Sequence, residues 1–112
     1  MKRGTNPALP PPLELECLQA LWEIGNGSVR DIQEALSRRR PLAYTTVMTL
    51  LARLARRGSV DRRKVGRCFL YTPTVSAETL RELALREVIR CHFGGSEPAL
   101  ISYLSSRERN VT

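Results

Sequence analysis

The sequence has few metal-ligating side chains and no long apolar run. It contains one histidine, His92, and three widely separated cysteines, Cys17, Cys68 and Cys91, with no CxxC pair. This spacing argues against the usual zinc sites, so we expect no metal and no cofactor. No run of roughly 18 apolar residues is present, and we therefore expect no membrane insertion.

Catalytic groups are equally scarce. His92 follows Cys91 directly, and neighbouring residues on a helix point about 100° apart, so these two cannot form a nucleophile–base pair. No glycine-rich loop that would cradle a phosphate is present. We expect that the chain is not an enzyme.

The N-terminal residues also lack an apolar stretch of the kind that exports a protein, which favours a cytoplasmic location. An odd number of cysteines in such a chain indicates reduced thiols. We expect the three thiols to be buried and to act as small apolar side chains.

Acidic residues are almost absent from the middle of the chain. The net charge is +7 over 112 residues, and residues 38–67 hold ten basic residues against Asp61 alone. The segments on either side are close to neutral. A localised basic zone is typical of a polyanion-binding protein, whereas a merely solubilising surface usually mixes both signs.

Apolar periodicity predicts three helices, at about residues 13–24, 28–40 and 43–57. Ser28 and Asp31 form a capping pattern at the start of the second helix. Residues 60–64 and 67–71 surround a turn at Val65-Gly66 and predict a β-hairpin, which Pro73 ends. Residues 1–12 are proline-rich without an apolar period, and we expect them to form a disordered tail.

Two further helices are expected, at residues 76–93 and, after Gly94-Gly95, a short one capped by Ser96. Their apolar residues predict either a fold-back onto the same domain or a homodimer, and we favour the homodimer. We divide the chain into a winged-helix domain at 13–74 and a helical dimerisation region at 75–112. The predicted dimerisation residues are Leu80, Leu83, Ala84, Val88, Ile89, Phe93, Leu100, Ile101 and Leu104.

The order of three helices and a basic hairpin predicts a mainly α fold with a small β-hairpin, a winged helix-turn-helix followed by dimerisation helices. In this fold the third helix enters the major groove of DNA. Thr45 and Thr49 would form hydrogen bonds with base edges or phosphates, and Arg53 and Arg56 would reach phosphates. The hairpin tip, expected to carry Arg62, Arg63, Lys64 and Arg67, would follow the DNA backbone or enter a minor groove.

The stretch from Leu18 to Tyr71 resembles the penicillinase repressor family, of BlaI/MecI type. Similarity continues more weakly to about residue 106. The residues that carry the resemblance are Ala20-Leu21-Trp22-Glu23, Ser28-Val29-Arg30-Asp31-Ile32, Leu42-Ala43-Tyr44-Thr45-Thr46-Val47-Met48-Thr49-Leu50-Leu51, Arg53-Leu54, Gly58 and Lys64-Val65-Gly66-Arg67.

The resemblance implies a transcriptional repressor that binds inverted-repeat DNA operators as a homodimer. The family's DNA contacts fall here on Tyr44, Thr45, Thr46, Met48 and Thr49. In antibiotic-responsive members a membrane-bound sensor metalloprotease triggers cleavage of the repressor, at a position that corresponds here to Ser102-Tyr103. The Asn–Phe pair cleaved in the best-known members is absent, as is the cysteine cluster of the copper-responsive members.

Two alternatives remain open. Winged helices also serve as protein-interaction modules, because a fold does not decide a function. Alternatively, Cys68 or Cys91 could make the chain a thiol-based redox regulator.

Overall fold

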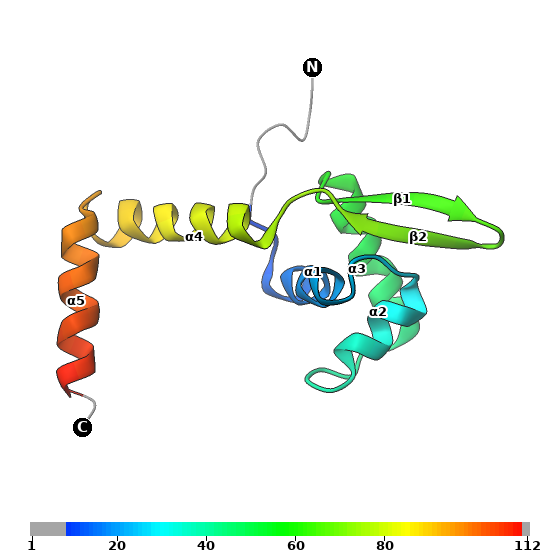
Figure 1. Cartoon of the computed structure of the whole chain (residues 1–112), viewed down its shortest axis with the longest axis horizontal. Helices are drawn as coiled ribbons and strands as arrows, with labels where there is room; N and C mark the ends of the chain where they lie inside the picture. The colour runs from blue at the N-terminus through cyan, green and yellow to red at the C-terminus, as the bar shows by residue number, and fades with distance from the viewer. Residues whose placement is uncertain (1–8, 111–112) are drawn as a thin grey trace, which may run out of the picture. The chain divides into compact units, whose positions relative to one another are not determined.

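The computed structural model describes residues 9–110 and contains two compact units, which divide after Leu80. The first unit contains α1 (Pro12–Ile24), α2 (Val29–Leu36), α3 (Tyr44–Arg56), β1 (Val60–Val65), β2 (Cys68–Pro73) and the first turn of α4 (Ala77–His92). The second holds the rest of α4 and α5 (Glu97–Asn110). Figure 1 shows these elements, and the expected order of three helices and a β-hairpin is confirmed.

The core of the first unit lies among its three helices. In α3 the buried residues are Val47, Leu50, Leu51 and Leu54, spaced i, i+3, i+4 and i+7 as the sequence predicts. The same core takes fully buried side chains from α1 and α2, namely Cys17, Leu18, Leu21, Ile32 and Leu36. Because one side of α3 packs into this core, its opposite side lies at the surface.

The start of α2 confirms the expected cap. The Ser28 hydroxyl accepts a hydrogen bond from the Asp31 backbone N–H, and the Asp31 carboxylate accepts one from the Ser28 N–H. The helix ends at Leu36, earlier than expected, because the Arg39 N–H bonds to the Leu36 carbonyl and closes a turn. The Gln33 side chain then donates to the Leu42 carbonyl at 2.9 Å and holds the connection into α3.

A third, one-residue strand extends the hairpin. The Gly27 N–H donates to the Tyr71 carbonyl at 3.0 Å, and the Tyr71 N–H donates back at 2.8 Å. A Cβ added at Gly27 would lie 2.9 Å from side-chain atoms of Ile24 and Asp31, so only glycine fits at this position without a shift of its neighbours. The bridge fastens the hairpin to the loop between α1 and α2.

The base of the hairpin is held by further hydrogen bonds. The Thr74 N–H donates to the Ser59 carbonyl at 2.9 Å, and the Trp22 indole N–H donates to the Val75 carbonyl at 2.9 Å. At the other end, Gly66 takes a φ of +63°, which lets the chain reverse between the strands. The hairpin is therefore anchored at its base and extends beyond the helices of its unit (Figure 1).

The expected N-terminal tail is partly wrong. Residues 1–8 lie outside the described residues. Pro10 is buried, and Pro12 opens α1, where a proline costs no hydrogen bond. The tail prediction therefore fails for the residues next to α1.

In the second unit, α5 begins after the expected cap, because the Ser96 hydroxyl accepts from the Ala99 N–H at 3.1 Å. This helix has 14 residues and is longer than predicted. The centroids of the Phe93 and Tyr103 rings lie 5.6 Å apart.

Leu80, predicted to face a second copy, is instead buried in the first unit. Within residues 9–110 no helix is both long and apolar enough to cross a membrane.

The three cysteines differ in environment, which corrects the expectation that all are buried. Only Cys17 is buried, whereas Cys68 and Cys91 are exposed. Burial, together with the nearby carboxylates of Glu16 and Glu14, raises the pKa of the Cys17 thiol to about 12. Because the thiolate is the reactive form, Cys17 stays unreactive at neutral pH.

We therefore expect a thiol-alkylating reagent at pH 8 to label two cysteines of the native chain, Cys68 and Cys91. Cys17 should react only after unfolding, when burial no longer suppresses its ionisation. Mass spectrometry of native and urea-unfolded samples measures this directly. Labelling of native Cys17 at the rate of Cys68 would contradict the described core.

Candidate nucleic-acid interface

The outer face of α3 carries small polar and basic side chains. At about 100° per residue, Thr45, Thr49 and Arg56 lie opposite the buried stripe, and all three are exposed. Arg53 is exposed beside them, whereas Thr46 is only half exposed. The outer face of α3 can therefore present these side chains to a groove wide enough to admit a helix.

The two threonines are joined by a hydrogen bond. The Thr49 hydroxyl donates to the Thr45 carbonyl at 3.0 Å, within the same helix. The Thr49 oxygen therefore keeps its lone pairs for an incoming donor, and its methyl group remains at the surface. This geometry fits contact with an exocyclic amine or a thymine methyl of a base pair.

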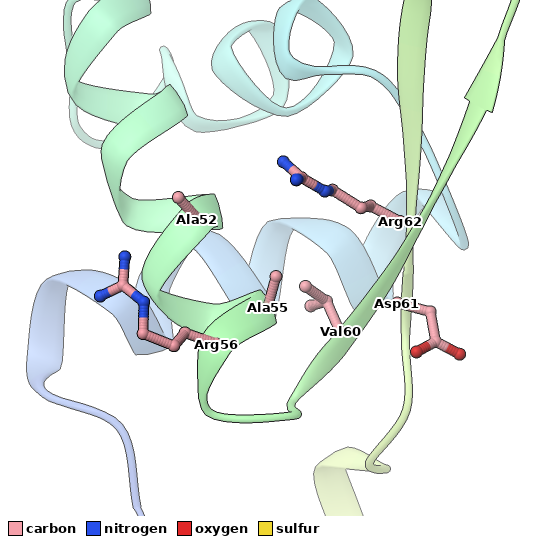
Figure 2. A pocket seen from close by; sticks show the side chains of 6 residues that line it. All are labelled: Ala52, Ala55, Arg56, Val60, Asp61 and Arg62. Atoms are coloured by element: carbon pink, nitrogen blue, oxygen red, sulfur yellow. The ribbon is translucent and has the colours of Figure 1, made fainter.

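The side of α3 next to the hairpin borders a groove, which we call the wing groove. It consists of two hollows that share Ala52 and Arg62. One, of about 450 Å³, includes Tyr44, Met48 and Phe69 in its lining, and the other, of about 460 Å³, includes Arg56. Figure 2 shows the second hollow between the end of α3 and strand β1.

The hairpin distributes its basic residues over two faces, not over its tip as predicted. Side chains alternate along a strand, so Arg62 and Lys64 share the face of buried Val60, and Arg63 lies on the opposite face. Arg62 pairs with Tyr71 in mid-strand. Of the predicted tip residues, Lys64 and Arg67 lie near the turn.

Ion pairs separate the basic residues of segment 38–67 into two groups. Three of them pair with carboxylates of α1: Arg39–Glu23 at 3.1 Å, Arg40–Glu16 at 2.7 Å and Arg57–Glu14 at 3.4 Å. The hydrogen bond from Arg40 lowers the pKa of Glu16. The charges of these three arginines are therefore partly neutralised by α1.

The other basic residues of this segment have no ion pair within the described chain. They are Arg38, Arg53, Arg56, Arg62, Arg63, Lys64 and Arg67, and all but Arg38 lie on α3 or the hairpin. Among residues 9–110, Asp61 is the only acidic residue that lines the wing groove, and its carboxylate points away from the guanidinium groups of Arg56 and Arg62 (Figure 2). The exposed charge of this surface is therefore strongly positive.

Phe69 and Arg30 belong to the wing groove and were not predicted from the sequence. Phe69 is 38% exposed and lies under the Arg62 guanidinium, 4.5 Å from its ring centroid. Arg30, near the start of α2, lines the hollow that contains Tyr44. Ala52 follows Met48 by four residues on α3, and the helical period places it on the side opposite the buried stripe.

Other predicted residues are divided as follows. Tyr44, Met48, Arg62 and Arg67 meet in one hollow, whereas Arg63 lies on the other face of the hairpin. In the second unit Leu83, Ala84, Ile89 and Phe93 are half-buried, Leu100 is buried, and Val88, Ile101 and Leu104 are exposed. Ser102 and Tyr103, the possible cleavage site, lie inside α5.

Comparison with known proteins identifies the family. Residues 11–112 match the sequence model of the penicillinase repressor family. The chain is 35% identical over 97 residues to the transcriptional regulator BlaI of Mycobacterium tuberculosis, covering 85% of this chain and 70% of that protein. It is 24% identical over 88 residues to the penicillinase repressor of Bacillus licheniformis, covering 79% and 69% respectively.

Two solved structures match about two thirds of the chain. The DNA-binding domain of the repressor BlaI in solution matches with a TM-score of 0.57 and 26% identity, covering 64% of this chain and 88% of that domain. The monomeric form of Bacillus licheniformis BlaI, solved with the blaP half-operator, matches with a TM-score of 0.55 and 26% identity, covering 65% and 89%. The winged-helix fold is thereby confirmed, and the chain belongs to the penicillinase repressor family.

Proposed function

We propose that this chain is a sequence-specific DNA-binding repressor of transcription. The observation that carries the proposal is the set of unpaired basic residues on α3 and the hairpin, on either side of the wing groove. A major groove about 12 Å wide admits one helix, and α3 presents two threonines and two arginines on its exposed face. The likeness to a BlaI structure solved with a half-operator supports this assignment.

Sequence selectivity is assigned to Thr45 and Thr49, because they are the small polar groups at the centre of the exposed face of α3. The arginines of α3 and the hairpin supply affinity through phosphates, which carry no sequence information. Loss of one good base contact costs about 1–3 kcal/mol of discrimination. Substitution of a threonine and of an arginine should therefore have different consequences.

Selection from a pool of random DNA duplexes with the full chain tests the proposal. The wild-type chain should enrich one sequence, and Thr49→Ala should bind that sequence more weakly while keeping its affinity for random duplex. Arg53→Ala, the matched substitution on the same helix, should weaken both equally. If no sequence is enriched, or if Thr49→Ala weakens both kinds of duplex alike, the assignment fails.

We also assign a homodimer, with the second unit as the contact surface. Ile101, Tyr103 and Leu104 of α5 are 57%, 53% and 48% exposed, and Leu85 and Val88 of α4 are exposed as well. Apolar groups of this number on a 30-residue helical unit favour a partner, and a twofold pair is the commonest assembly. A twofold dimer would suit an inverted-repeat operator.

Ile101→Asp is expected to raise the dimer dissociation constant at least about tenfold, or 1.4 kcal/mol, because an unpaired carboxylate resists burial. Ser106→Asp adds the same charge at an exposed position on the other side of α5 and serves as the control. Sedimentation equilibrium measures both constants. Equal dissociation constants for the two variants would place the dimer contact elsewhere.

Release by a sensor metalloprotease belongs to the proposal as well. Ser102 and Tyr103 lie in the middle of a helix, and proteases act on extended chain, so cleavage there would require local opening of α5. The cytoplasmic location is a further part of the proposal.

The alternatives give different outcomes. A protein-interaction module would bind its partner with little dependence on salt and would not shift DNA. A thiol-based regulator would lose its response to oxidant when Cys68 and Cys91 are replaced by serine. The unpaired basic surface favours DNA over both.

A further inference from the structure

The side of α3 that borders the wing groove changes from large to small residues. Its N-terminal half presents Tyr44 and Met48, which are 43% and 45% exposed. Its C-terminal half presents Ala52 and Ala55, which line the hollow beside β1. Tyr44 and Met48 line one hollow of the wing groove, Ala55 lines the other, and Ala52 borders both.

Two guanidinium groups border the hollow beside β1. Figure 2 shows the Arg62 side chain extending from β1 toward α3, with Arg56 on the far side of the alanines. Both are without a carboxylate partner in the described chain, and the Asp61 carboxylate points away from them. The hollow therefore has a cationic rim and a floor of small side chains.

Arg62 is held in place by its neighbours on the hairpin. Its guanidinium lies 4.5 Å from the centroid of the Phe69 ring, and its strand partner Tyr71 is buried. A guanidinium stacked on an aromatic ring loses less conformational freedom when it binds an anion. Phe69 is thus placed to act as a positioning residue for Arg62.

We propose that this hollow seats one phosphate of the DNA backbone and that Arg56 and Arg62 bind it together. The inference rests on the proposed function and assigns a particular subsite within it. Paired planar guanidinium groups suit the geometry of a phosphate. The alanines matter because they leave room for the sugar–phosphate chain between α3 and the hairpin.

A shared phosphate makes a distinctive prediction for salt dependence. Each neutralised phosphate adds about 0.9 to the slope of log K against log salt concentration. Arg56→Ala and Arg62→Ala alone should leave the slope nearly unchanged, because the remaining arginine still neutralises the phosphate. The double variant should lose about 0.9, whereas arginines on separate phosphates would lose about 0.9 singly and about 1.8 together.

Ala52→Leu tests the phosphate site without altering any charge. By filling the hollow it should reduce the salt slope by about 0.9 and the affinity at 0.1 M salt about eightfold. Ala35→Leu is the matched control, since Ala35 is a half-buried helical alanine in a hollow that also contains Asp31 and Glu34. It should leave the slope unchanged.

The probe is a fluorescent 30-base-pair duplex of mixed sequence, titrated by anisotropy between 50 and 300 mM NaCl, with circular dichroism to show that each variant is folded. If the wild-type chain does not bind the duplex, both the proposed function and the phosphate site are excluded. If the wild-type binds but Ala52→Leu matches Ala35→Leu, or the two single arginine variants each lose a full contact, the shared phosphate site alone is overturned.

Discussion

Replacing Arg62, Arg63 and Lys64 by alanine is expected to lower the affinity for duplex DNA about 60- to 500-fold at 0.1 M salt. All three are exposed and unpaired within the described chain. If each neutralises its own phosphate, the salt slope falls by about 2.7; if Arg56 keeps the phosphate that it shares with Arg62, the slope falls by about 1.8. Titrations at several salt concentrations measure both quantities.

The matched control removes three positive charges from the second unit, with Arg86, Arg90 and Arg107 replaced by alanine. Arg86 and Arg90 already pair with Glu82 and Glu87, so they add little to the field at the interface. We expect the control variant to keep its salt slope. Equal slopes in wild-type and in the β1 variant would exclude the hairpin from the DNA contact.

Leu51→Ala is expected to lower the free energy of unfolding by about 2–5 kcal/mol. Leu51 is fully buried in the stripe through which α3 packs on the core. Since domains of this size are stable by only about 5–15 kcal/mol, the substitution removes a large share of the total. The midpoint of thermal unfolding should fall by at least about 8 °C, because each kcal/mol shifts it by about 4–8 °C in a small domain.

Thr49→Ala, on the exposed face of the same helix, serves as the control and should change stability by no more than about 0.5 kcal/mol. The two variants separate the functions of α3, since its inner face supports the fold and its outer face meets DNA. A Leu51→Ala variant as stable as Thr49→Ala would show that α3 does not pack as described.

Local sequence signals predicted the helices of the first unit well. The stripe of Val47, Leu50, Leu51 and Leu54 and the cap at Ser28 follow from spacing within one turn or two. These features depend on neighbours in sequence, so periodicity and capping preferences suffice to find them.

Features that depend on distant residues were not predictable in the same way. No local signal at Gly27 indicates that its backbone pairs with Tyr71, which lies far along the chain. Glu14 is buried within 3.4 Å of the Arg57 side chain, a pairing that only the packing of α1 on α3 creates. A count of charges along the sequence places Arg57 in one basic zone, because the count cannot reveal a carboxylate partner as distant as Glu14.

The candidate nucleic-acid interface was likewise predictable only where it depends on local sequence. The exposed face of α3 follows from its period, so Thr45, Thr49 and Arg56 were identified correctly as surface residues. The hairpin register decides which face of the strand each basic residue occupies, and Arg62 and Arg63 were therefore wrongly grouped at the tip. Phe69 gains its importance only through its contact with Arg62 across the hairpin.

The most direct test of the DNA-binding surface is to follow backbone amide resonances during titration with the duplex enriched by selection. We predict that the largest chemical-shift changes fall within Tyr44–Arg56 of α3 and Val60–Val65 of β1, and that they diminish as salt is raised. Changes concentrated in residues 81–110, or binding that leaves α3 and β1 unperturbed, would contradict the account.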